Sequence, residues 1–159
     1  MGLKKADLET GEPLFSFLGQ WHSNLVYINR KKCVLFVNDK TLFNFIVPNV
    51  LRADIRQLGE MFRSHLNYAL ANEGFPKELR KKVLNEYDEI SFGKSNSRSV
   101  LGNINDLSFH YEVWIVENGG VNDADIPATI KQLNRMPMRK KVGYIWPEEE
   151  IRKLYETAT

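Results

Sequence analysis

The sequence predicts an α+β fold, with an antiparallel meander of three to four strands packed by about four helices in a single domain over residues 1–159. Three short apolar segments between residues 24 and 47, separated by NRKK and NDKT, are typical of strands joined by hairpins. Apolar residues then recur at steps of three and four, the period of amphipathic helices. Hydrophobic residues make up 43% of the chain, which is ordinary for one globular domain.

Residues 1–20 are expected to form an irregular lead-in, because glycine and proline interrupt any regular period there. The strands are expected at 24–28, 33–37 and 42–47. The middle segment, CVLFV, is apolar throughout instead of alternating. It is therefore expected at the centre of the sheet, covered on both faces or by a partner chain.

Helices are expected after Pro48. Helix-stop and helix-start residues, such as Gly74 and Pro76, separate them. The expected elements are a helix over 50–73, a second after Pro76, a third over 99–117, a loop over 118–125, a short helix near 128–136 and a C-terminal helix over 146–157.

Charge and cysteine content narrow the class of protein. The net charge is +2, from 22 basic and 20 acidic residues, which is too small to indicate nucleic-acid binding by itself. The single cysteine, Cys33, excludes an intramolecular disulfide and favours a reducing, cytoplasmic compartment. We expect Cys33 to be a buried small apolar residue. No apolar run reaches the roughly 18 residues of a membrane span, so a soluble protein without a membrane partner is expected.

The expected helix over 99–117 has two contrasting sides. The side predicted to face the core consists of Val100, Ile104, Leu107, Tyr111 and Trp114. A polar stripe within about 60° consists of Ser99, Asn103, Asp106 and His110. Phe109 and Val113 flank this stripe, so the helix is apolar nearly all round and is expected to be central. Gly102 in its interior predicts that another element passes close by.

Two interpretations of the polar stripe remain open. In the structural one, Ser95 or Ser97 caps the helix, and Asp106 and His110 form a stabilising pair four residues apart. In the functional one, Asp106 orients and charges His110 as an acid or base. Arg98 and the serine-rich loop then bind an anion at the positive helix N-terminus.

Three segments resemble a family of bacterial and archaeal domains of unknown function: WHSNLVYINRKKCVLFVND (21–39), KSNSRSVLGNIND (94–106) and LNRMPMRKKVGYIWPEEEI (133–151). The matching residues are Trp21, His22, Asn24, Leu25, Asn38, Arg98, Ser99, Gly102, Asn105 and Asp106. The chain departs from the pattern at Ser95, where threonine is common, and at Ile104, where methionine is. Some members precede a domain named after a plasmid open reading frame, so the resemblance implies a mobile-element or defence setting and no specific activity.

Other chemistry has weaker support in the sequence. A metal site would need His22, His110 and Asp106 to converge without any close ligand spacing, so we expect no metal and no cofactor. Basic residues cluster at 30–32, at Lys94 and Arg98, and at 135–141. Each cluster alone is typical of a solvated turn. On one face with Tyr144 or Trp146, they would form a surface that follows phosphates.

We therefore predict a non-catalytic binding or interaction module for protein or nucleic acid, either monomeric or homodimeric. The candidate binding residues are Trp21, His22, Asn24, Ser95, Ser97, Arg98, Ser99 and Asn103. The alternative is a small hydrolase or nuclease, with His110 as acid or base, Asp106 orienting it and Arg98 holding a phosphate. A solvent-open pocket shared by these three residues and His22 would favour the enzyme.

Overall fold

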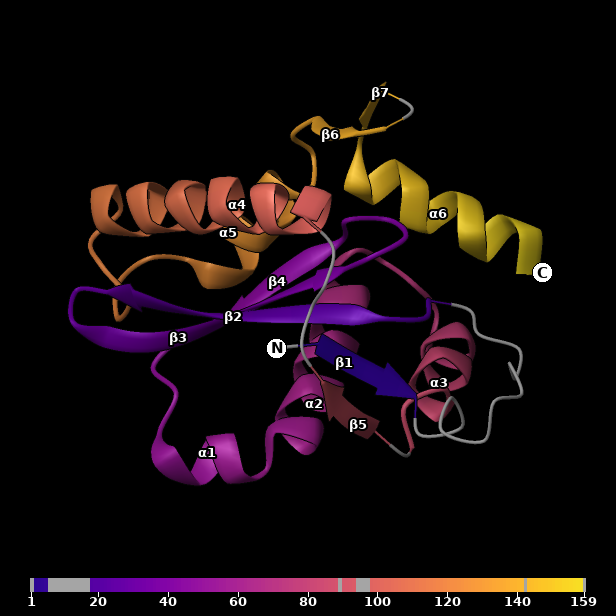
Figure 1. Ribbon diagram of the computed structural model, residues 1–159, viewed down its shortest axis with the longest axis horizontal. Coiled ribbons are helices and arrows are strands. Elements are labelled where there is room, and N and C mark those ends of the chain that lie inside the picture. Colours follow the sequence, from indigo (N-terminus) through magenta and orange to yellow (C-terminus); the bar gives the residue numbers. More distant parts are fainter. Residues whose placement is uncertain (1, 6–17, 89, 94–97, 142, 159) are drawn as a thin grey trace.

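The computed structural model describes residues 2–5, 18–88, 90–93, 98–141 and 143–158. A five-stranded antiparallel sheet lies between two helical layers, with the strand order β4-β3-β2-β1-β5 (Figure 1). Its strands are β1 (Gly2–Lys5), β2 (Trp21–Ile28), β3 (Lys31–Asn38), β4 (Asn44–Val47) and β5 (Ile90–Gly93). The α+β fold and the meander β2-β3-β4 confirm the prediction from the sequence.

The sheet is wider than the sequence indicates. Strand β1 lies inside the expected irregular lead-in, and β5 was not predicted at all. Both have only four residues, and β1 carries no apolar alternation. Their structure comes from pairing: β1 aligns Gly2 with His22 of β2 on one side and with Gly93 of β5 on the other. Such non-local pairing leaves little local signal in a sequence.

Strand β3 is the buried central strand that its unbroken apolar run predicts. It pairs with β2 on one side and β4 on the other. Val34 and Phe36 face one hydrophobic cluster, whereas Cys33, Leu35 and Val37 face the other. All five side chains are buried, so β3 is covered on both faces.

Two helical layers cover the sheet. The helices are α1 (Arg52–Arg56), α2 (Leu58–Asn72), α3 (Lys77–Asn85), α4 (Arg98–Glu117), α5 (Ile126–Leu133) and α6 (Pro147–Ala158). Residues of α2, α3 and α6 belong to the first cluster, and residues of α4 and α5 to the second. The expected helix over 50–73 is interrupted at Gln57, whose φ of -117° and ψ of 42° are not helical. A hairpin of β6 (Met138–Lys140) and β7 (Gly143–Ile145), too short for the sequence pattern to reveal, precedes α6.

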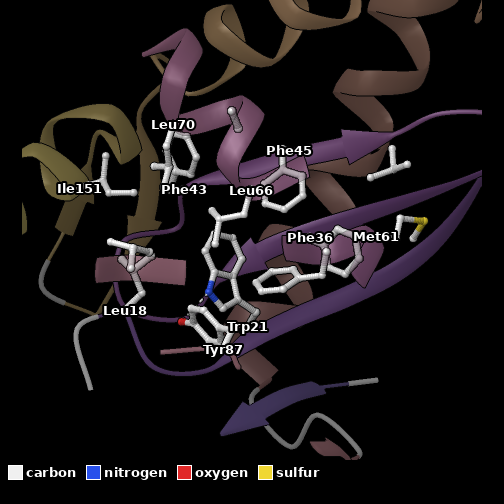
Figure 2. Close-up of a cluster of buried hydrophobic side chains, with 14 of the residues drawn as sticks. Leu18, Trp21, Phe36, Phe43, Phe45, Met61, Leu66, Leu70, Tyr87 and Ile151 are labelled. Atoms are coloured by element: carbon white, nitrogen blue, oxygen red, sulfur yellow. Dashed lines mark hydrogen bonds between the residues drawn. The ribbon is translucent and has the colours of Figure 1, made fainter. Parts of the chain in front are cut away.

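Aromatic rings fill the first cluster (Figure 2). The ring of Trp21 lies 5.6 Å from that of Phe45 and 5.2 Å from that of Phe62, in edge-on contacts. Its Nε1 donates a hydrogen bond of 2.9 Å to the Tyr87 hydroxyl, which in turn donates to the carbonyl of Gly19. This chain of contacts joins the start of β2 to α2 and to the end of α3.

A buried polar network connects the edge strand β4 to α4 and α5. Asn134 accepts from the backbone N–H of Asn44 at 2.9 Å and donates to its carbonyl at 2.8 Å, so a side-chain amide takes the place of a neighbouring strand. The Tyr111 hydroxyl donates to Asn44 Oδ1 at 2.6 Å. All three side chains are fully buried, so this network helps to fix the position of α4 on the sheet.

Buried tyrosines predict a loss of stability at alkaline pH. Burial raises the pKa of Tyr111 and of Tyr87 well above the ordinary value. Their stabilising contribution is complete below about pH 10, where an unfolded tyrosine is still neutral, and is lost as the pH rises further. We expect the urea concentration at the unfolding midpoint to decrease as the pH is raised from about 9 to about 11. An unchanged midpoint over this range would contradict the assignment of these phenols as buried and neutral.

Candidate functional site

Helix α4 has one face in the core and one in solvent. Its buried apolar side chains are Val100, Ile104, Leu107, Tyr111 and Ile115. Trp114 was predicted on this face, but it is 39% exposed, and Ile115 is buried there instead. The expectation that this helix is central to the fold is also wrong, since its outer side is open to solvent.

The polar stripe of α4 is divided by its surroundings. Asn103 is buried and donates a hydrogen bond of 3.1 Å to the carbonyl of Arg139 on β6. Asp106 and His110 are exposed, and no hydrogen bond or ion pair within the described residues engages either of them. Asn103 therefore attaches α4 to the hairpin, whereas the other two face solvent.

The remaining candidates in the serine-rich segment are only partly placed. Ser95 and Ser97 lie outside the described residues. The backbone of Arg98 and Ser99 forms the first turn of α4, but the description does not extend to their side chains. The anion-binding role expected of this segment therefore stays a prediction.

Of the candidates on β2, only Asn24 has a hydrogen bond to α4 within the described residues. His22 lies inside the sheet, on β2 between β1 and β3, although the strand was expected to begin only at residue 24. It is 1% exposed, with Nε2 2.9 Å from Asp39 Oδ1. Asn24 donates to the Ser108 hydroxyl of α4 at 3.3 Å, and Trp21 is buried in the aromatic cluster. Buried His22 and exposed Asp106 and His110 thus have different environments.

The basic clusters at 30–32 and 135–141 do not form one surface, and Lys94 and the Arg98 side chain lie outside the described residues. The hairpin tip at 29–31 lies beside the C-terminal end of α4, where Lys31 donates to Asn122. The cluster at 135–141 lies near the N-terminal half, where Asn103 contacts Arg139. Within it, Arg135 forms two hydrogen bonds with the Glu73 carboxylate, and Lys140 donates to two backbone carbonyls. Arg139 stays exposed and pairs across the hairpin with exposed Tyr144.

The outer face of α4 carries an apolar stripe that sequence reasoning did not recognise as a surface. Phe109 is 63% exposed, Val116 47% and Val113 36%. Gly102 is also exposed and lies seven residues, or two helical turns, before Phe109 on the same side, and we call these four residues the outer stripe. It spans about 21 Å at 1.5 Å per residue. The available signal was a second apolar periodicity on the side of the helix opposite the core.

Three pockets lie away from Asp106 and His110, and one of them includes Val116 of the outer stripe and another Asn24. An apolar pocket of about 250 Å³ lies between α2, α5 and β4, with Tyr68, Ile126 and Pro127 in its wall. Its volume is below the roughly 300 Å³ at which small-molecule sites begin. A polar one borders the loop at 119–123, and a third lies beside α1. None of the three is lined by His22, Asp106 or His110.

A family model described as a domain of unknown function, DUF6933, matches residues 1–150. The chain belongs to this family. The match runs from β1 into α6 and confirms the resemblance found in the sequence. No curated protein and no solved structure matches this DUF6933 chain. In the described part of the chain, no three His, Cys, Asp or Glu side chains gather as metal ligands would, and no helix is long and apolar enough to cross a membrane.

Gly102 gives a prediction about the outer stripe. The sequence led us to expect another element beside it, but an added Cβ would meet no described atom within 4 Å apart from its chain neighbours and the adjacent backbone of its own helix. Glycine in a helix interior costs about 1 kcal/mol relative to alanine. Gly102→Ala is therefore expected to raise the free energy of unfolding by about 0.5–1 kcal/mol in urea titrations of dilute protein. A destabilised variant would mean that the chain packs against this position.

Proposed function

We propose that the chain is a non-catalytic protein-interaction module whose contact surface is the outer face of α4. The observation that carries this proposal is the exposure of Phe109, Val113 and Val116 along one side of a helix whose other side lies in the core. Contiguous apolar patches on a protein surface mark sites of protein interaction, whereas single exposed apolar residues do not. Trp114 and Leu101, on the flanks of the same helix, are also exposed.

The surface is also held rigidly. Asn24 contacts Ser108, Asn103 contacts β6, and Tyr111 contacts β4, so α4 is fixed at three points along its length. A contact surface that is already ordered loses little conformational entropy on binding. The mobile-element or defence setting belongs to this proposal through the family resemblance alone.

A photoreactive residue tests the surface directly. We would introduce p-benzoylphenylalanine at Val113 and, as a control, at exposed Lys81 of α3, and irradiate cells that produce each variant. A discrete adduct at Val113 that is absent at Lys81 is expected. It should be lost when Phe109 is changed to aspartate, because a charge on the outer stripe opposes apolar burial. Equal labelling at both positions would overturn the proposal.

The hairpin β6-β7 supports a second candidate function, contact with single-stranded nucleic acid. The supporting observation is the cross-strand pair of exposed Arg139 and Tyr144, with exposed Trp146 two residues on. Proteins that bind single-stranded nucleic acid combine basic groups that contact phosphates with aromatic rings that stack on bases. We expect Arg139→Glu to weaken the binding of a labelled RNA or DNA oligonucleotide, measured by fluorescence anisotropy. Lys82→Glu, at an exposed position on α3, should leave the affinity unchanged. Equal affinities for the two variants would remove this candidate.

The hydrolase or nuclease remains the rival to both, with His110 as its acid or base. Asp106 and His110 are open to water, whereas active sites usually exclude it. The same oligonucleotides, incubated with and without a divalent metal, test this alternative. Cleavage by the wild type that disappears in His110→Ala would establish it over the interaction module.

A further inference from the structure

We infer that the partner of the outer stripe is a second copy of this chain, bound by antiparallel pairing of the two α4 helices about a two-fold axis near residue 108. This inference rests on the proposed function and names its partner. The helix lies along the outside of the molecule (Figure 1), and the stripe runs from its second turn to its last.

The spacing of the stripe fits a helix partner. Gly102, Asp106, Phe109, Val113 and Val116 alternate at steps of four and three, the pattern of the seam between two packed helices. In an antiparallel pair, residues whose numbers add to about 216 lie opposite one another. Gly102 then faces Val113 of the second copy, so the valine side chain occupies the space left by a glycine, which has no side chain. The two Phe109 rings meet beside the axis.

Charge complementarity selects a second copy over an unrelated partner. Asp106 of the seam faces His110, which flanks the seam of the second copy, and the axis repeats this pair. A histidine N–H donates to a carboxylate whether the ring is neutral or charged. On the other flank, Asn105 faces Glu112 of the second copy, an amide donor opposite a carboxylate. All four side chains are exposed, and no hydrogen bond or ion pair among the described residues engages them, although the His110 ring contacts that of Phe109. The same helix therefore carries both the donor and the acceptor of each of the two polar pairs, as a contact between identical helices requires.

The same pattern disfavours a parallel pair. Parallel helices with this seam would place Asp106 opposite Asp106 of the second copy, and Glu112 near its Glu117. Like charges facing one another oppose association. Because each two-fold contact is repeated, the antiparallel interface is closed and predicts a dimer, not a filament.

Disulfide cross-linking tests the orientation. In a Cys33→Ser background, which removes the chain's only native thiol, we would oxidise Gly102→Cys alone, Val113→Cys alone and a mixture of the two. The antiparallel pair predicts a cross-linked dimer in the mixture and little in either variant alone, because positions 102 of the two copies lie about 18 Å apart along the helix axis. Phe109→Cys alone should cross-link, and Leu51→Cys, exposed on another face, should not.

Each result decides the inference. A cross-linked mixture with little reaction in the separate variants supports the antiparallel pair. Efficient cross-linking of Gly102→Cys with itself overturns it in favour of a parallel pair. No cross-linking of any α4 variant, together with a Val113 photo-adduct to a different protein, overturns self-association but leaves the interaction module. No cross-linking and no photo-adduct overturns both.

Discussion

Replacing Trp21 by alanine is expected to lower the free energy of unfolding by about 4 kcal/mol, the typical loss when a large buried aromatic side chain is truncated. Trp21 is fully buried and contacts the rings of Phe45 and Phe62. The substitution removes these contacts, leaves a cavity, and takes from Tyr87 its hydrogen-bond donor. Urea denaturation followed by far-ultraviolet circular dichroism measures the loss.

Trp114→Ala is the matched control, because Trp114 is 39% exposed on α4. We expect this variant to lose less than about 1 kcal/mol in dilute solution. Similar losses for the two tryptophans would contradict the assignment of Trp21 to the core. A Trp21→Phe variant, which keeps a ring in the cluster, should fall between the two and remains measurable if the alanine variant does not fold.

The second large effect is expected for Asn134→Ala, at about 3 kcal/mol. This change leaves the N–H and the carbonyl of Asn44 buried without the partner that serves both, and each unsatisfied buried group costs about 1–3 kcal/mol. Asn85→Ala is the control, since Asn85 is exposed at the end of α3 and should change stability by less than about 0.5 kcal/mol. Thermal and urea denaturation of both variants provide the comparison.

A loss below about 1 kcal/mol for Asn134→Ala would mean that water replaces the amide at the edge of β4. The Asn44–Asn134 contact would then not be needed to hold α4 and α5 on the sheet. Hydrogen exchange at the Asn44 amide distinguishes these cases, because its protection should fall only if the edge becomes open to water.

Local patterns in the sequence predicted the elements whose signal is local. The unbroken apolar run of β3 indicated a central strand, and the period of α4 identified all but one of the apolar residues on its buried face. The sequence did not reveal β1, β5 or the β6-β7 hairpin. These short strands exist because they pair with distant or hairpin partners, and four or fewer residues carry no measurable period.

The candidate site was predicted less completely, because burial depends on tertiary packing. Asn103 and His110 occupy one polar stripe in the sequence, but only Asn103 is covered, by β6. Because Trp114 and Ile115 are both apolar and adjacent, the sequence pattern could not decide which of them faces the core. Phe109 and Val113 were interpreted as flanks of the polar stripe, and together with Val116, which the sequence did not single out, they form the exposed surface instead.

Sedimentation velocity tests the central claim, that the outer face of α4 is an interaction surface, most directly. Wild-type protein, the Phe109→Asp/Val113→Asp double variant and a Leu51→Asp control would be compared over a hundredfold range of concentration. We predict a dimer for the wild type and the control, and a folded monomer for the double variant. A double variant that associates as strongly as the wild type would contradict the account, because association would then use another surface.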